Sequence, residues 1–432
     1  MTGSDTTVRL GVLGCGHVGA ALIRLVEAHA PVIAQRTGVG LEVARVAVRD
    51  TSRDRDVPVA ADLFTDDPAG VVGSGDVDLV VELIGGTDPA QSLVVAALDA
   101  GKPVVTANKE LIAHAGVDLF DRAADAGVDF LFEASVGGGI PLVRPLRESV
   151  AGDHIRRVLG IVNGTTNYIL TKMTEEGAGF DESLAEAQAL GFAEADPTAD
   201  VEGFDAAAKA AIVASIAFGA HVTLADVHRE GITDVTIDDI DAARQLGYVV
   251  KLLAIAEEQG DGVAVRVHPA MVPDGHPLAA VRESFNAVFI EGDAVGELMF
   301  YGRGAGGGPT ASAVLGDVVD AARNLAAGHP GAAMGTLEQR RVLPIGEIES
   351  QFYLPMEVVD RPGVLAAIAG VFGQHDVSIK SMQQHGLGEE AQLNLVTHLA
   401  PESAFAATVE ELRGHDAVKN VGRMLRVTGD DT

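Results

Sequence analysis

The chain has 432 residues, of which 47% are hydrophobic and 22% are charged, and its formal net charge at pH 7 is −31. This length and composition are typical of a globular protein with two or three domains. Because so strong a negative charge repels phosphate backbones and anionic lipid, we expect neither a nucleic-acid partner nor a membrane partner.

The absence of targeting signals and the number of cysteines bear on the location of the protein and on its possible disulfides and metal sites. We find no apolar run of the roughly 18 residues that a membrane span needs. The first ten residues, MTGSDTTVRL, lack the apolar core of a signal peptide, so we expect a cytoplasmic protein. Cys15 is the only cysteine, which excludes an intrachain disulfide and a metal site built from several thiolates.

A glycine loop follows the first predicted strand. Residues 7–14, TVRLGVLG, form a short apolar run, and ALIRLVEAHA (21–30) has helical spacing. The sequence GCGHVG between them has the G-x-G-x-x-G spacing that lets a pyrophosphate sit on a helix start, although a tight turn without a ligand can share it. The residues that we expect to contact a nucleotide here are Leu13, Gly14, Gly16, His17, Val18 and Gly19.

Strand-like and helix-like segments alternate after this loop. The strand-like segments are residues 41–50, 77–86, 102–109 and 128–135. Because helix-like segments separate them, the sequence predicts an α/β fold with a doubly wound parallel sheet. We place this Rossmann-like nucleotide domain at residues 1–140.

The end of the second predicted strand bears on the choice of cofactor. Arg49 suits the 2′-phosphate of NADP, whereas Asp50 suits the free ribose of NAD. Both lie further from the glycine loop than the usual ~20 residues, which we attribute to an insertion at residues 30–40. The cofactor is therefore NADP or NAD, and Arg49 favours NADP.

Two segments near the end of this domain carry further candidates. In VTANKE (105–110), Thr106 and Lys109 end a predicted parallel strand, where such sheets bind ligands, although Lys109 could also be a helix-start lysine without a role. The segment EASVGGGI (133–140) can present carbonyl oxygens to a hard cation, or can be a simple turn.

Residues 191–209, GFAEADPTADVEGFDAAAK, gather five carboxylates ahead of one lysine. Asp205 and Lys209 are four residues apart in a predicted helix, where their side chains can meet. The alternative is an exposed ion pair worth about a few tenths of a kcal/mol. Asp196 precedes a proline and is predicted to be a turn residue, and we give Asp200 and Glu202 a structural or supporting role.

A second glycine cluster, GRGAGGGPTAS (302–312), precedes a predicted helix with Pro309 in its first turn. We expect it to return the chain to the nucleotide domain over about residues 303–327, with the backbone near Gly308 against the cofactor. A flexible linker is the alternative, and the predicted helix after the cluster argues against it.

After a predicted linker at residues 328–349, residues 350–432 follow the order strand, helix, strand, strand, helix, strand. This is the ferredoxin-like order, with its last strand at VKNVGRMLRVTG (418–429). The turn DRPGVL (360–365) after the first strand resembles that of an ACT domain, and the resemblance implies that an amino acid is held at this helix start. The expected contacts there are Asp360, Pro362, Gly363 and Val364.

Five segments resemble those of homoserine dehydrogenase, in the same order. They are VTANKE (105–110), EASVGGGIP (133–141), VNGTTNYIL (162–170), GFAEADPTADVEGFDAAAK (191–209) and GRGAGGGPTASAVLGD (302–317). The C-terminal segment resembles an ACT domain, a small amino-acid-sensing module. The resemblance implies NAD(P)-dependent interconversion of L-homoserine and L-aspartate 4-semialdehyde, in threonine and methionine biosynthesis, by a homodimer or homotetramer.

The resemblance also implies roles for individual residues. Lys209 exchanges a proton with the substrate oxygen while the nicotinamide exchanges a hydride, and Asp205 orients Lys209 and the substrate. Lys109 contacts both the cofactor and the substrate, and Glu194 holds the substrate ammonium. The other expected substrate contacts, within a substrate-binding and dimerisation domain at residues 141–302, are Gly191, Asn163, Gly164 and Thr165.

Two further ligands follow from the resemblance. A sodium ion would be held by Glu133 and by the carbonyls of Val136, Gly138 and Ile140. L-threonine would be a feedback effector bound by the ACT domain. Because catalysis is assigned to residues before 330, we predict that a chain cut after about Leu343 stays folded and active with reduced threonine sensitivity, unless the C-terminal module also holds the oligomer together.

Two other functions share parts of this pattern. Aspartate-semialdehyde dehydrogenase forms a thioester on a cysteine, and the only cysteine here lies in the predicted phosphate loop. A catalytically inactive sensor of nucleotides and amino acids would not need Lys109, Asp205 and Lys209 together. An assay of NADPH oxidation with aspartate semialdehyde separates this sensor from an enzyme.

Overall fold

The computed structural model describes residues 6–428 except 333, 336 and 387–389. Three predictions fall partly outside the described residues. They are the absence of a signal peptide, which concerns residues 1–5, the linker, which includes residues 333 and 336, and the last strand, which ends at residue 429. The chain divides into two compact units. Unit 1 comprises Met1–Val158, Ala208–Leu224 and Phe285–Gln339, and unit 2 comprises Leu159–Ala207, Ala225–Ser284 and Arg340–Thr432.

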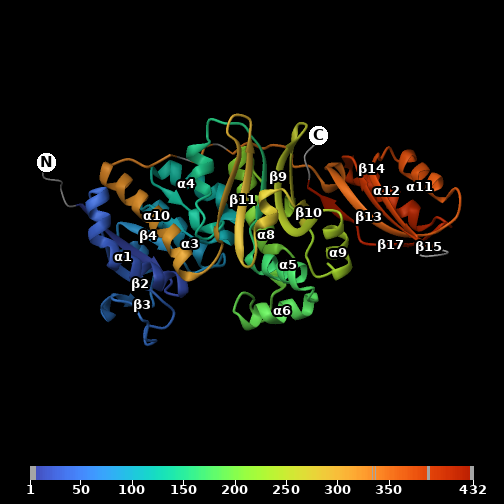
Figure 1. Ribbon diagram of the computed structural model, residues 1–432. Helices are drawn as coiled ribbons and strands as arrows, with labels where there is room; N and C mark the ends of the chain where they lie inside the picture. Colours follow the sequence, from blue (N-terminus) through green and yellow to red (C-terminus); the bar gives the residue numbers. More distant parts are fainter. Residues whose placement is uncertain (1–5, 333, 336, 387–389, 429–432) are drawn as a thin grey trace. The chain divides into compact units, whose positions relative to one another are not determined.

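A parallel six-stranded sheet lies at the centre of unit 1 (Figure 1), with the strand order β3-β2-β1-β4-β5-β6. This is the doubly wound order of nucleotide-binding domains, so the predicted fold class is confirmed. The strands are β1 (Thr6–Leu13), β2 (Val39–Ala47), β3 (Phe64–Thr65), β4 (Leu79–Glu82), β5 (Val104–Thr106) and β6 (Phe130–Leu131). The helices are α1 (His17–Thr37), α2 (Pro68–Gly73), α3 (Ala90–Asp99), α4 (Lys109–Ala126) and α10 (Gly307–Ala327).

The core of this domain lies between the sheet and helices α1 and α10. The second half of strand β1, Leu10–Leu13, is apolar and buried, as expected for a sheet covered on both faces. Helix α1 contributes Leu22 and Val26 to the same core, and α10 contributes Val314. This packing fixes the start of each helix against the end of β1, where the glycine loop lies.

Helix α1 is longer than predicted. It continues to Thr37 and ends at Gly38, whose φ of 76° is the left-handed conformation that commonly ends a helix. Residues 30–37, which we read as part of an insertion, are therefore further turns of this helix, and they account for the distance between the glycine loop and Arg49. By length and composition α1 could cross a bilayer, a segment that the sequence reading missed, but its buried residues lie in the core of unit 1.

Unit 1 also contains the antiparallel hairpin of β11 (Phe285–Gly292) and β12 (Gly296–Arg303). Strand β7 (Ile155–Ile161) and helix α8 (Phe204–Phe218) each contribute residues to both units.

The first part of unit 2 is built on a long antiparallel hairpin. Strands β9 (Tyr248–Gln259) and β10 (Gly262–Pro273) pair over their full lengths, and nearly every residue of β10 is buried. The other elements of this part are α5 (Gly164–Glu176), α6 (Phe180–Ala189), α7 (Thr198–Val201), β8 (His228–Arg229) and α9 (Ile237–Gln245).

The C-terminal part of unit 2 has the predicted ferredoxin-like order (Figure 1). Its antiparallel sheet has the order β17-β13-β15-β14, and stacked rings of Phe352 and Phe405 lie in its core. The strands are β13 (Glu349–Val359), β14 (Ile379–Gly386), β15 (Glu390–Thr397), β16 (Ala400–Pro401), β17 (Val418–Val421) and β18 (Leu425–Val427). The helices are α11 (Val364–Gln374) and α12 (Glu402–Arg413).

The last predicted strand is in fact two strands. The chain leaves the ladder at Gly422, whose N–H donates to the carbonyl of Pro355, and a Cβ at Gly422 would lie 2.8 Å from the Pro355 ring. Beyond this break, β18 pairs antiparallel with β13 and parallel with β10, matching Arg426 to Ala270. The C-terminal strand therefore joins the ferredoxin-like sheet to the β9–β10 hairpin.

Candidate functional site

The glycine loop after β1 has the geometry of a phosphate cradle. Gly14 has a φ of 101°, and a Cβ there would lie 2.7 Å from the carbonyl oxygen of Leu83. A Cβ at Gly19 would lie 2.2 Å from the carbonyl oxygen of Gly14, so neither position can carry a side chain without movement. Gly16, directly before α1, faces open space within 4 Å. The loop therefore fits a pyrophosphate at the start of α1.

Helix α10 begins beside this loop. A Cβ at Gly307 would lie 3.0 Å from the carbonyl oxygen of His17, whereas one at Gly308 would meet nothing within 4 Å. Gly307, which the sequence reading did not single out, is thus the glycine that packs on the start of α1, and Gly308 follows it with open space around its Cα. Two helix starts therefore lie at the same place, which favours an anionic ligand.

Polar residues at the ends of β4 and β5 form one hydrogen-bonded group. Glu82 is fully buried, and its carboxylate accepts from the Ile84 N–H at 2.7 Å and from the Thr106 hydroxyl at 2.6 Å. Asn108 caps α4 by accepting from the Leu111 N–H at 3.1 Å. These contacts fix the position of Lys109 as the first residue of α4, at the carboxyl ends of the strands.

The loop after β2 carries more arginines than the sequence reading used. Arg49 is exposed, and the Asp50 carboxylate accepts from the N–H and hydroxyl of Ser52. Arg55 donates to the carbonyl of Asp50 at 2.8 Å. Burial raises the pKa of Cys15 in the glycine loop, and the positive charges of Arg55 and Arg24 oppose that shift. The run TSRDRD after Asp50 was the signal that could have pointed to Arg55.

The segment that carries Glu194 is held against α5. Gly191, with a φ of 76°, ends α6, and the Phe192 carbonyl accepts from the Thr165 hydroxyl at 2.6 Å. Gln188 donates to the backbone carbonyl of Glu194 at 3.0 Å, while the Glu194 residue is exposed. Asp196 accepts from the N–H and hydroxyl of Thr198, as its predicted role in a turn requires.

Asp205 is held from a different part of the chain. Asn163 donates from its amide to the Asp205 carboxylate at 2.9 Å and to the Asp200 carboxylate at 2.6 Å. The other oxygen of Asp200 accepts from the Thr165 hydroxyl at 3.2 Å. Asp205 is 7% exposed, and the network brings together three predicted residues, namely Asn163, Thr165 and Asp205.

Helix α8 carries both Asp205, in its first turn, and Lys209, one turn later. Lys209 is half-buried, and the residues between the two are three buried alanines. The arrangement presents a carboxylate and an ammonium on one face of a helix that is mostly buried after its first residue.

Asn163 and Gly164 also define the start of α5. The Asn163 side chain caps this helix by accepting from the Thr166 N–H at 2.9 Å. One turn further, the Asn167 amide oxygen accepts from the ammonium of Lys251 at 3.0 Å. Lys251 is 2% exposed, and burial lowers its pKa to about 8. The sequence reading missed Lys251, whose signal was a charge inside the apolar run YVVKLLAIA.

The predicted sodium segment is tightly folded. The carboxylate of Glu133 accepts N–H bonds from Leu142, Val143 and Arg144, which take up most of its lone pairs. Val136 and Ile140 are buried, and Gly138 has a φ of 56°. A cation at this segment would therefore depend on backbone carbonyls, because the carboxylate is already used. Within residues 6–428, as far as they are described, no group of three His, Cys, Asp or Glu side chains could hold a metal ion.

The predicted effector turn lies between β13 and α11. Gly363 is the N-cap of α11 with a φ of 93°, and Asp360, Pro362 and Gly363 are exposed. Val364 is buried in the core of the ferredoxin-like domain. The turn thus presents free space at a helix start beside a carboxylate.

Comparison with known proteins gives one consistent result. Residues 14–133 match the family described as "Homoserine dehydrogenase, NAD binding domain", residues 141–319 match "Homoserine dehydrogenase", and residues 353–416 match "ACT domain". The homoserine dehydrogenase of Mycobacterium tuberculosis is 49% identical over 440 residues, which cover 99% of this chain and 99% of the relative.

Two solved structures are similar as well. A homoserine dehydrogenase from Thiobacillus denitrificans has a TM-score of 0.92 and 40% identity, over 98% of this chain and 99% of that chain. A hyperthermophilic archaeal homoserine dehydrogenase in complex with NADPH has a TM-score of 0.61 and 29% identity, over 73% of this chain and 98% of that chain.

Proposed function

The chain belongs to the homoserine dehydrogenase family, and on that premise we propose which of its residues carry out the reaction. The protein is an NAD(P)-dependent oxidoreductase that interconverts L-homoserine and L-aspartate 4-semialdehyde. The observation that carries the proposal is the placement of Asp205 and Lys209 on one helix, with Asp205 held at 2.9 Å by Asn163.

NADP(H) is the proposed cofactor. The residues that would hold its pyrophosphate are Gly14, Gly16 and Gly19, where a cradle without side chains meets the start of α1. The nicotinamide ring, when bound, supplies or accepts the hydride. Arg49 and Arg55 offer guanidinium groups to a 2′-phosphate, and the similar archaeal structure contains NADPH. The other proposed contacts are Leu13, His17, Val18, Thr106 and Gly308.

Lys209 is the proposed proton carrier. Its ammonium gives a proton to the aldehyde oxygen during reduction, and its amine takes the alcohol proton during oxidation. Asp205 orients this group, because its own carboxylate is fixed by Asn163. Lys109 adds a second positive charge that stabilises the developing alkoxide. Asn163, Gly164 and Thr165 offer the start of α5 to the substrate carboxylate.

Glu194 is the proposed partner of the substrate ammonium. Replacing it by Gln should raise KM for homoserine more than it lowers kcat, because this contact contributes mainly to binding of the ground state. Steady-state kinetics with homoserine as the varied substrate measure both constants. Glu176→Gln, a change in an exposed carboxylate at the end of α5, is the control. An unchanged KM in Glu194→Gln would remove this residue from the site.

Arg49 is the residue that we propose to bind the 2′-phosphate of NADP(H). Arg49→Ala should weaken NADP(H) binding and spare NAD(H), since only the former carries the phosphate. Fluorescence titration with each reduced cofactor gives the two dissociation constants. Equal weakening of both cofactors would show that Arg49 does not read this group.

The remaining proposals concern assembly and regulation. We assign residues 1–140, completed by 303–327, to nucleotide binding, 141–302 to substrate binding and dimerisation, and 350–432 to an ACT domain joined by residues 328–349. A cytoplasmic homodimer or homotetramer is expected, with sodium on the carbonyls of Val136, Gly138 and Ile140. L-threonine is the proposed inhibitor, bound at the turn of Asp360 and the start of α11.

The test is the initial rate of NADPH oxidation with L-aspartate 4-semialdehyde, measured with and without L-threonine. The proposal expects turnover that threonine lowers. An inactive sensor would bind the ligands without turnover. Turnover that does not change with threonine concentration would support the dehydrogenase activity and would contradict the proposal that threonine is an inhibitor.

A further inference from the structure

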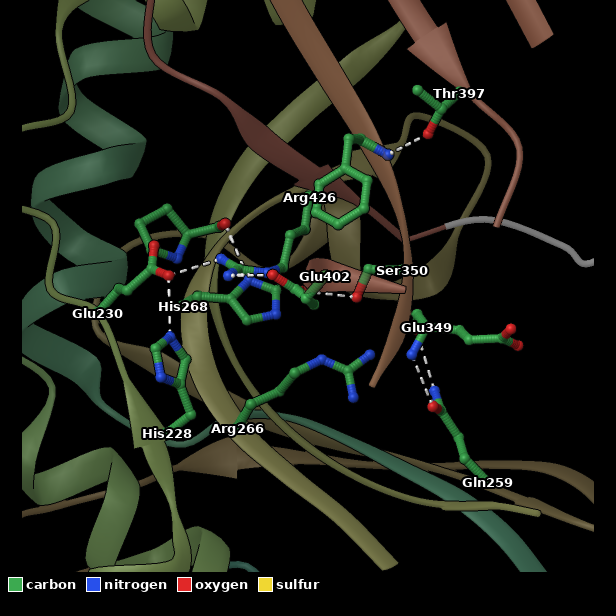
Figure 2. A network of polar contacts seen from close by, with 12 residues as sticks. His228, Glu230, Gln259, Arg266, His268, Glu349, Ser350, Thr397, Glu402 and Arg426 are labelled. Carbon is green, nitrogen blue, oxygen red and sulfur yellow. Dashed lines mark hydrogen bonds and ion pairs between the residues drawn. The ribbon is translucent and has the colours of Figure 1, made fainter. Parts of the chain in front are cut away.

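A buried ion-pair network surrounds Arg426 of the C-terminal strand β18 (Figure 2). The Arg426 guanidinium donates to both carboxylate oxygens of Glu402, at 2.5 Å and 2.8 Å, and lies 2.8 Å from the Glu230 carboxylate. The side chains of Arg426 and Glu402 are 6% and 7% exposed. Paired charges with so little solvent hold a fixed geometry, because breaking the pair would leave a buried charge without a partner.

Glu230 connects this network to a second segment. Its carboxylate also lies 3.0 Å from Nε2 of His228, and its backbone N–H donates to the carbonyl of Val267 in β10. Figure 2 shows Glu230 between His228 and Arg426, which approach it from different strands. The segment 228–233 is therefore anchored both by the β10 backbone and by the C-terminal strand.

The far side of the segment 228–233 meets the start of helix α8. The Arg229 guanidinium donates to the carbonyl of Glu202 at 2.5 Å and stacks over the Phe204 ring, 3.4 Å from its centroid. The Thr233 hydroxyl donates to the Glu202 carboxylate at 2.6 Å.

Backbone packing adds to these side-chain contacts. The Ile232 N–H donates to the carbonyl of Val201 at 2.8 Å, and a Cβ at Gly231 would lie 2.4 Å from that carbonyl oxygen. No side chain fits at Gly231, so the two segments are in close backbone contact.

We propose that segment 228–233 is a positioning element for the catalytic helix, and that Arg426 holds this element in place. Phe204 directly precedes Asp205, so Arg229 acts on the residue that begins α8. A displacement of this start would move Asp205 against Asn163 and would tilt the turn that leads to Lys209. Misplacement by about 1 Å far from the chemistry can cost on the order of 10²-fold in rate. The inference rests on the proposed roles of Asp205 and Lys209.

The first test removes the contact of Arg229 with α8. Arg229→Met keeps the aliphatic stem and loses the guanidinium, and we expect kcat to fall roughly 10- to 100-fold while the NADPH dissociation constant stays within about twofold. Arg229→Lys, which keeps a cation over the Phe204 ring, should recover part of the loss. Arg244→Met, at an exposed ion pair on α9, is the matched control and should keep its kcat.

Thermal unfolding separates positioning from a purely structural role. A structural role would lower the unfolding temperature of Arg229→Met and leave kcat unchanged well below that temperature, which would overturn the proposal. Loss of turnover in Lys209→Met with normal turnover in Arg229→Met would refute the positioning element alone. Normal turnover in Lys209→Met would instead refute the catalytic assignment.

The second test asks whether Glu230 transmits the anchoring by Arg426. Glu230→Gln keeps the shape of the side chain and removes its charge, so it should also lower kcat. In the double variant Arg229→Met/Glu230→Gln, the fold-loss of kcat should be smaller than the product of the two single losses, because both residues act on the same element. If the two losses multiply fully, Glu230, and through it Arg426, does not act on the same element as Arg229.

Discussion

Lys209→Met should lower kcat by roughly 10²- to 10⁴-fold, which is the contribution of a positioned proton carrier. The variant keeps an unbranched side chain of similar length on α8 and removes the ammonium that we propose to exchange a proton with the substrate oxygen. NADPH binding should change little, because the proposed pyrophosphate cradle lies at the start of α1. Steady-state rates in both directions and fluorescence titration with NADPH measure the two quantities.

Lys380→Met provides the control for this change. Lys380 is an exposed lysine in β14 of the ferredoxin-like domain, so its loss should leave kcat unchanged. Near-normal turnover in a correctly folded Lys209→Met protein would show that Asp205 and Lys209 are not catalytic and have only the structural role of an ion pair. A large loss of NADPH affinity would move Lys209 from the substrate to the cofactor.

Cutting the chain after Leu343 should give a protein that aggregates or has lost most of its activity. The sequence alone predicts the opposite, because all the proposed catalytic residues precede residue 330. The structure supplies the reason for the change: β18 pairs with β10 at Ala270 and Met271, both fully buried. Without β18 and β13, this edge of β10 would lose its neighbouring strand, and the carboxylate of Glu230 would lose Arg426 and keep only His228.

The matched control for this cut is a chain that ends at Thr428, which keeps β18 and Arg426. It should remain monodisperse in size-exclusion chromatography and keep its initial rate. An active, monodisperse protein from the cut after Leu343 would contradict the importance of the β10–β18 pairing. The effect of threonine is therefore better measured on the full chain than on a truncated one.

Local patterns in the sequence were sufficient for most of the fold. The strand, glycine loop and helix at the N-terminus were predictable because turn glycines and apolar spacing act over short distances. The division of the last strand at Gly422 was not, since it depends on a close contact with Pro355. The pairing of β18 with β10 joins residues more than 150 positions apart, and no periodicity reports such a contact.

The site followed the same division. The spacing of Asp205 and Lys209 was readable because four residues make about one turn of a helix. The network that holds Asp205 was not, because Asn163 reaches it from 42 positions away and shares its amide with Asp200. No sequence pattern pointed to Arg229, because its proposed role depends on its contact with the ring of Phe204 in the folded chain.

The most direct test of the central claim, that Lys209 carries the proton during hydride transfer, is a single-turnover measurement. Enzyme with bound NADPH, in excess over L-aspartate 4-semialdehyde, is mixed rapidly and NADPH absorbance is followed in the unmodified protein and in Lys209→Met. The design excludes product release from the measured rate. The account predicts a single-turnover rate that is roughly 10²- to 10⁴-fold lower in Lys209→Met at equal NADPH occupancy. Equal single-turnover rates in the two proteins would contradict it.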